Sequence, residues 1–206
     1  MTVTLKRCQS RLAQMRRAAL LLGCLLPAVL SGHWLAQAQE NRPPDYRVKA
    51  AFIYNFGKFV EWPASAFASA DAPLVIGVLG GDPFHGDCER IVVNKSINGH
   101  PVIVRQISHP AGARQPPDYS DLKSCHILFI SASATGNLPD ILDALRGASV
   151  LTVTDNLDRF ATSGVIINLV MENESVRFEI NDDAARHAGL KISSKLLTLR
   201  TNKPIK

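Results

Sequence analysis

The sequence predicts a single three-layer α/β domain. We expect a mostly parallel central sheet of about five to six strands, helices on both faces and a C-terminal antiparallel hairpin. Short apolar runs such as 74–79 and 126–130 are typical of strands covered on both faces. Helical periodicity separates these runs, and the segments 164–170 and 176–180 flank a short polar turn that predicts a hairpin.

The first elements follow from local patterns. A helix is predicted at about 45–62, because apolar residues recur every three or four positions until Pro63 ends the pattern. A strand at 74–79 comes next, followed by a helix at 82–93 that begins with a capping aspartate and a proline. The second strand is predicted at 101–107.

The second half of the chain continues the alternation of strands and helices. The remaining predicted strands are 126–130, 150–154, 164–170 and 176–180, and the remaining predicted helices are 137–146, 184–188 and 192–199.

Residues 1–38 predict a cleaved secretory signal peptide. A basic segment ends at 16–17, an apolar run covers 18–30, and residues 36–38 form an A-x-A cleavage site. The apolar run contains a proline and is shorter than the roughly 20 residues that a membrane span needs. We therefore expect one mature, exported domain, 39–206.

The charge gives no support for nucleic-acid binding. The chain has 23 basic and 18 acidic residues, a net charge of +5, but residues 1–38 hold five of the basic residues and no acidic one. The mature domain is therefore neutral and lacks the positive field that binds phosphate backbones. No nucleic acid is expected as a partner.

The mature domain contains two cysteines, Cys88 and Cys125. An even cysteine count in an oxidising compartment favours a disulfide between them. The bridge would close a loop of about 37 residues and add about 4 kcal/mol at most. Two buried free thiols are the alternative. No CxxC motif occurs, so no metal site is expected.

No motif predicts catalysis or a cofactor. GxSxG and HExxH are absent, and the five histidines of the mature domain are scattered. A hydrolase or redox enzyme is therefore the weakest hypothesis, and we expect a protein that is not an enzyme.

Two loops after predicted strands are candidates for ligand binding. Gly80, Gly81 and Asp82 follow the first strand, and Ser131 follows the strand at 126–130. Open α/β sheets bind ligands at the carboxyl ends of their strands. The glycine loop lacks GxGxxG spacing and a P-loop lysine, so a tight strand-to-helix turn explains it better than a nucleotide site does, and a small ligand is the alternative.

The first helix carries a broad aromatic face that includes Phe56, Phe59 and Trp62. Most such rings belong to the core, but a face this wide can extend into an interface, where aromatic residues concentrate binding energy. Arg177, within an otherwise alternating strand, is a fourth candidate contact, although an exposed strand face explains it equally well.

Several blocks resemble the YfiR family. They are KAAFIYNFGKFVEWP at 49–63, IGVLGGDPF at 76–84, CHILFIS at 125–131, VLTVTD at 150–155 and VRFEIN at 176–181. The blocks occur in order over about Tyr46 to Leu199, nearly the whole mature chain.

The resemblance implies a soluble, dimeric periplasmic repressor. Such a protein binds the periplasmic sensor region of an inner-membrane diguanylate cyclase and thereby limits cyclic di-GMP and biofilm formation. An OmpA-like outer-membrane lipoprotein sequesters the repressor. The resemblance also places Cys88 and Cys125 at family cysteine positions and implies a redox-sensitive disulfide. The alternative function is a periplasmic small-molecule-binding protein that acts with another membrane sensor or receptor.

Overall fold

The computed structural model describes residues 44–109 and 119–200. The chain divides into two units after Pro43, and every described residue belongs to the second unit. The predicted signal peptide, its cleavage site, Cys8 and Cys24 lie outside the described residues. None of the helices in the described part of the chain combines the length and apolar character needed to cross a bilayer.

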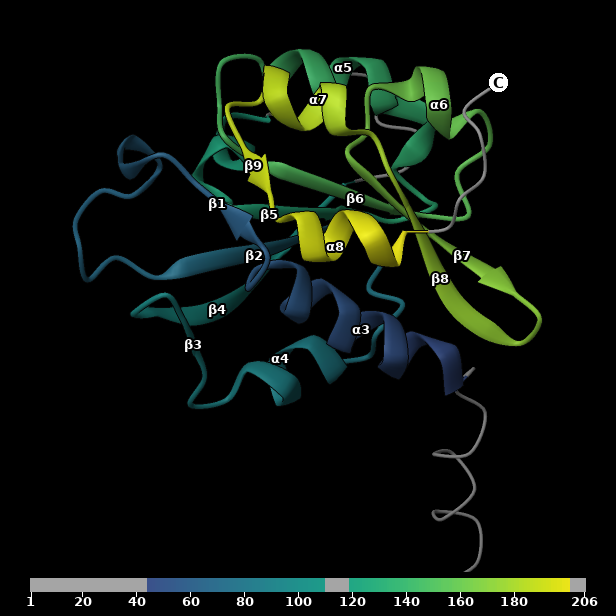
Figure 1. Cartoon of the computed structure of the whole chain (residues 1–206), viewed down its shortest axis with the longest axis horizontal. Coiled ribbons are helices and arrows are strands. Elements are labelled where there is room, and N and C mark those ends of the chain that lie inside the picture. The colour runs from purple at the N-terminus through teal and green to yellow at the C-terminus, as the bar shows by residue number, and fades with distance from the viewer. Residues whose placement is uncertain (1–43, 110–118, 201–206) are drawn as a thin grey trace, which may run out of the picture. The chain divides into compact units, whose positions relative to one another are not determined.

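The described residues form a seven-stranded sheet with the order β3-β4-β2-β5-β6-β7-β8 (Figure 1). The five inner strands are parallel, whereas β3 and β8 pair antiparallel at the two edges. The strands are β2 (Leu74–Leu79), β3 (Ser96–Ile97), β4 (His100–Ile107), β5 (Ile127–Ile130), β6 (Leu151–Asp155), β7 (Ile167–Glu172) and β8 (Ser175–Ile180). The inner order β4-β2-β5-β6-β7 is that of a doubly wound α/β fold, so the predicted fold class is confirmed.

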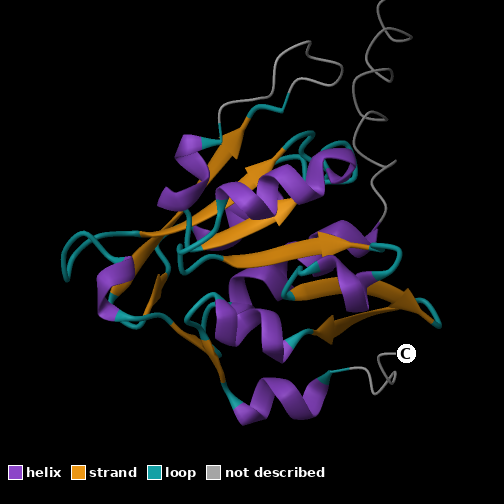
Figure 2. Cartoon of the chain, turned by 90° about the horizontal axis from the view of Figure 1, so that it is seen from above, coloured by secondary structure: helices purple, strands orange, loops and turns teal. Residues whose placement is uncertain are grey.

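Helices cover both faces of the sheet (Figure 2). The helices are α3 (Pro44–Phe56), α4 (Asp87–Val92), α5 (Leu138–Ala144), α6 (Phe160–Ser163), α7 (Asp182–His187) and α8 (Ser194–Leu199). The short 3₁₀ segments are η2 (Ala64–Ala66), η3 (Ser120–Ser124) and η4 (Thr135–Asn137).

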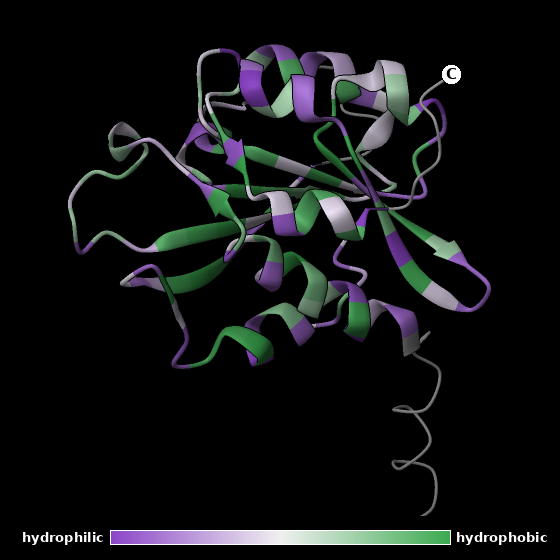
Figure 3. Ribbon diagram, viewed as in Figure 1, coloured by the Kyte–Doolittle hydropathy of each residue, from purple (hydrophilic) through white to green (hydrophobic). Residues whose placement is uncertain are grey.

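The sheet separates two apolar clusters. Neighbouring side chains of β2 point to opposite faces, so Ile76 and Val78 pack with α3 and α4, whereas Val75 and Leu79 pack with α5. All six residues of β2 are buried, which explains its continuous apolar sequence. Figure 3 shows hydrophobic residues concentrated along the central strands.

The first helix is shorter than predicted. It ends at Phe56, and Val60–Glu61 form strand β1, which pairs antiparallel with β9 (Lys191–Ile192). At Gly57, where the chain leaves the helix, a Cβ atom would lie 2.7 Å from Ile97 Cδ1, so a larger residue there would require the Ile97 side chain to shift. Periodicity did not predict this strand pair, because its two strands are 130 residues apart along the chain and contain two residues each.

The C-terminal hairpin is confirmed. β7 and β8 pair antiparallel from Ile167↔Ile180 to Glu172↔Ser175. Asn173 and Glu174 at the turn have φ values of 48° and 59°, in the left-handed region that a two-residue hairpin turn of type I′ requires.

Candidate functional site

The predicted ligand loops meet at the carboxyl ends of the parallel strands. β2 and β5 are adjacent and parallel, so the loops after them, which carry Gly80 and Ser131, lie side by side. This is the position where the strand order reverses, and doubly wound sheets bind ligands there. Gly80 has φ +92°, and a Cβ atom there would lie 2.4 Å from Ser131 Oγ, which shows how closely the loops approach.

Polar groups in these loops are bonded to one another. The Gly81 backbone N–H donates to Ser133 Oγ at 3.0 Å, and Ser133 Oγ lies 2.8 Å from Ser131 Oγ. The Asp82 carboxylate accepts from the backbone N–H groups of Phe84 and Gly86, at 2.8 Å and 3.0 Å. Ser133 lies two residues after Ser131, in the same predicted ligand loop. These bonds explain why the loop residues are polar.

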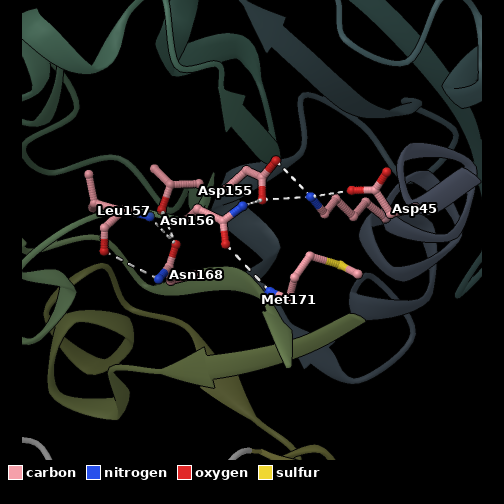
Figure 4. Close-up of polar contacts among 8 residues, drawn as sticks. Asp45, Asp155, Asn156, Leu157, Asn168 and Met171 are labelled. Atoms are coloured by element: carbon pink, nitrogen blue, oxygen red, sulfur yellow. Dashed lines mark hydrogen bonds and ion pairs between the residues drawn. The ribbon is translucent and has the colours of Figure 1, made fainter. Parts of the chain in front are cut away.

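A buried charge cluster lies at the carboxyl end of β6, and sequence reasoning missed it (Figure 4). Lys49 in α3 is 1% exposed, although its ammonium group is charged. Its Nζ lies 2.8 Å from an oxygen of Asp45 and 2.9 Å from both oxygens of Asp155. It also lies 4.5 Å from the centre of the Tyr46 ring, within cation–π range.

The electrostatics of this cluster keep Lys49 charged. Burial lowers the pKa of Lys49, but the two carboxylates outweigh burial and raise the pKa above its ordinary value. Burial and the Asp155 carboxylate also raise the pKa of Tyr46. The ion pair between Lys49 and Asp155 therefore connects α3 to the end of β6.

Two asparagines extend the cluster into the hairpin (Figure 4). Asn156 donates to Asp155 Oδ1 at 3.0 Å and accepts from the Met171 backbone N–H at 3.4 Å. The buried Asn168 side chain accepts from the Leu157 backbone N–H at 2.9 Å and donates to Glu179 Oε2 at 3.0 Å. These bonds tie β6, β7 and β8 together at their polar ends.

The predicted partner contacts lie in different environments. Phe56 is 1% exposed and packs against the rings of Phe52 and Phe178, so its prediction as a contact residue is wrong. Trp62 is half-buried and its Nε1 donates to the His126 carbonyl at 3.2 Å. Phe59 is half-buried, and Arg177 is exposed on β8.

The predicted Cys88–Cys125 disulfide is wrong for this structure. Both cysteines are buried free thiols. Cys88 packs with the cluster beneath α3 and α4, whereas Cys125 belongs to the cluster on the opposite face of the sheet. The sheet therefore lies between them. Burial raises the pKa of Cys88 well above its ordinary value and raises the pKa of Cys125 to about 11.

Comparison with protein families identifies the chain. The model of the YfiR/HmsC-like family matches residues 46–200. The chain belongs to the YfiR/HmsC-like family. Members of this family are periplasmic regulators of cyclic di-GMP signalling that act with a membrane-associated partner. A search of curated proteins gives no match. Within residues 44–109 and 119–200, no three metal-ligating side chains come together.

Proposed function

We propose that this chain is a periplasmic repressor of an inner-membrane diguanylate cyclase. The mature domain binds the periplasmic sensor region of the cyclase and keeps it inactive, which limits cyclic di-GMP and biofilm formation. The match to the YfiR/HmsC-like family over 46–200 carries this proposal, because it covers nearly every described residue. The proposal includes export by cleavage of residues 1–38, a homodimer, and sequestration by an OmpA-like outer-membrane lipoprotein.

Redox control by a Cys88–Cys125 disulfide is not part of the proposal. The two thiols are free and buried in separate apolar clusters on opposite faces of the sheet.

Among the predicted contacts, Arg177 is the best candidate for partner binding. It is exposed on the edge strand β8, and its side chain lies on the face opposite to Phe178. Edge strands and exposed arginines are common at interfaces between proteins.

The test is capture of the cyclase. The mature protein, 39–206, is used as bait with detergent-solubilised membranes of the source organism, and bound proteins are identified by mass spectrometry. We expect a membrane diguanylate cyclase among them, and we expect cellular cyclic di-GMP to rise when the gene is deleted. Unchanged cyclic di-GMP together with no captured cyclase would contradict the proposal.

A charge reversal tests the contact residue. Arg177→Glu should weaken capture of the cyclase while leaving the melting temperature unchanged, because the side chain is exposed. Lys195→Glu makes the same change of charge at an exposed position of α8 and serves as the matched control. Equal capture by Arg177→Glu, Lys195→Glu and the wild type would exclude Arg177 from the interface.

The topology favours a second function, a small-molecule-binding protein. The observation is the meeting of the Gly80 and Ser131 loops where the strand order reverses. Native mass spectrometry of the protein purified from the periplasm tests it, because a bound metabolite adds a fixed mass. A Gly81→Leu variant should lose that added mass, since a Cβ atom there would already lie 3.7 Å from Ser133 Oγ in the second loop. If only the mass of the protein without a bound metabolite is detected, the small-molecule-binding function is contradicted.

A further inference from the structure

A buried histidine lies at the amino end of the parallel sheet, and both of its ring nitrogens form hydrogen bonds. His126 immediately precedes β5 and is 6% exposed. Its Nδ1 accepts the backbone N–H of Val75 at 3.1 Å, and its Nε2 lies 3.1 Å from the carbonyl oxygen of Ala66. A carbonyl can only accept, so Nε2 carries the proton and Nδ1 does not. The neutral ring therefore satisfies both neighbours.

The backbone of His126 is also fully bonded. Its N–H donates to the Val75 carbonyl at 2.9 Å. Its carbonyl accepts from the Leu151 N–H at 2.8 Å and from Trp62 Nε1 at 3.2 Å. One residue thus connects β2, β6 and the segment that follows β1.

A second histidine holds the other end of that segment. The Phe67 ring stacks between His126 and His100, with ring centres 4.3 Å and 3.8 Å apart. His100 Nδ1 donates to the Ala72 carbonyl at 2.7 Å. The segment Pro63–Pro73 contains no fully buried residue, and only Phe67 packs partly buried against the apolar core, so these hydrogen bonds and ring contacts help to hold the segment on the sheet.

Protonation affects the two histidines differently. A proton on His126 Nδ1 would face the buried Val75 N–H, placing two donors against each other. His100 already donates from Nδ1, so a proton on its Nε2 leaves the bond to Ala72 intact. Burial lowers the pKa of His126, the bond to Ala66 opposes that effect, and the charge of His100 lowers the pKa further.

The other elements around His126 supply few charges. β1 carries Glu61 and the segment carries Asp71, and both side chains are exposed. β2 has no ionisable side chain, and the ionisable residue of β6, Asp155, lies at the far end of that strand against Lys49. No carboxylate is buried beside the ring to favour its charged form, as far as the described contacts show.

We propose that His126 is a pH-sensitive clasp: the neutral imidazole holds segment Pro63–Pro73 against β2 and β5, and protonation releases it. The neutral form is required for the bonds to Val75 and Ala66, so release follows acidification without any partner or ligand. The clasp would make one surface segment of the repressor depend on the pH around it.

Hydrogen exchange of the mature protein tests the clasp. Protection of segment Pro63–Pro73, corrected for intrinsic exchange, should fall by up to about tenfold per pH unit below about 6.5, the ordinary pKa of histidine. Amides of β5 and β6 serve as the internal reference and should keep their protection. Equal protection of the segment at pH 7.5 and pH 5.0 would overturn the proposal.

A variant separates His126 from other titrating groups. His126→Asn keeps an oxygen near the position of Nδ1 and cannot titrate, so the pH dependence of the segment should disappear. His187→Asn changes an exposed histidine and should leave the pH dependence intact. Persistence of the same pH dependence in His126→Asn would overturn the proposal.

If His126→Asn does not fold, nitrogen chemical shifts of the wild-type ring decide the question. The neutral Nε2–H form should persist below pH 6.5, and the Val75 amide resonance should move as the ring titrates. A ring that titrates with no change at Val75 would overturn the clasp. The experiment needs no cyclase, so its outcome is independent of the proposed function.

Discussion

Two buried polar clusters lie at opposite ends of the sheet, and each satisfies its buried groups by different chemistry. At the carboxyl end, Lys49 is charged and lies between Asp45 and Asp155. At the amino end, His126 is neutral and lies between a backbone donor and a backbone acceptor. The carboxyl-end cluster depends on pairing of opposite charges, whereas the amino-end cluster depends on His126 Nδ1 staying unprotonated.

The two clusters should respond to pH in opposite ranges. The pKa of Lys49 is raised, so its contribution to stability is present below its ordinary pKa and is lost only as the pH rises through the folded-state value. The pKa of His126 is lowered, so its contribution is present above about 6.5 and is lost as the pH falls toward the folded-state value. Mild acid should therefore loosen the amino end first.

The largest expected effect on stability comes from removing the buried ammonium group of Lys49. Lys49→Met leaves two carboxylates without their cation and should lower the free energy of unfolding by about 3–5 kcal/mol, measured by urea denaturation.

An exposed ion pair provides the matched control for that change. Arg146→Met breaks the Arg146–Asp143 pair, whose side chains are 80% and 65% exposed, and should cost less than about 1 kcal/mol. Similar losses in Lys49→Met and Arg146→Met would mean that the carboxyl-end cluster does not depend on charge pairing.

A smaller effect is expected at the amino end. Trp62→Phe keeps an aromatic ring but removes the N–H that donates to His126, so it should cost about 1 kcal/mol. The loss stays moderate because the His126 carbonyl still accepts from Leu151. Urea denaturation followed by circular dichroism measures it, and a loss as large as that of Lys49→Met would make the two clusters energetically equivalent.

The smallest effect on stability is expected from treating the protein with a reducing agent. Because Cys88 and Cys125 are free and lie on opposite faces, dithiothreitol should leave the melting temperature unchanged. Both thiols should react with Ellman's reagent only after unfolding, since burial raises the pKa of each. A mass two hydrogens lighter in the oxidised protein, with a lower melting temperature after reduction, would restore the disulfide.

Patterns along the chain predicted the strands better than the helix ends. The run at 74–79 matches β2 from end to end, because a strand buried on both faces must be apolar at every position. The predicted helix at 82–93 begins instead at Asp87. The Asp82 carboxylate accepts two backbone N–H groups in a turn before the helix, and a capping residue alone cannot specify how soon the helix follows.

The candidate sites were only partly predictable. The loops with Gly80 and Ser131 were predicted together, because the carboxyl ends of parallel strands share an edge of the sheet. The Lys49 cluster was missed, since Lys49 and Asp155 are 106 residues apart and each has an ordinary local sequence. Phe56 was assigned to the aromatic face correctly, but periodicity does not show how far the core extends across that face.

The sequence by itself determined the alternation of strands and helices, the hairpin and the resemblance to the YfiR family, because these depend on apolar patterns and motifs within short segments. Only the tertiary structure decided that Cys88 and Cys125 lie on opposite faces, that Lys49 meets Asp155, and that His126 binds Val75 and Ala66. Alternation along a strand shows that neighbouring side chains separate, but which helix covers each face depends on pairing between strands distant in the chain.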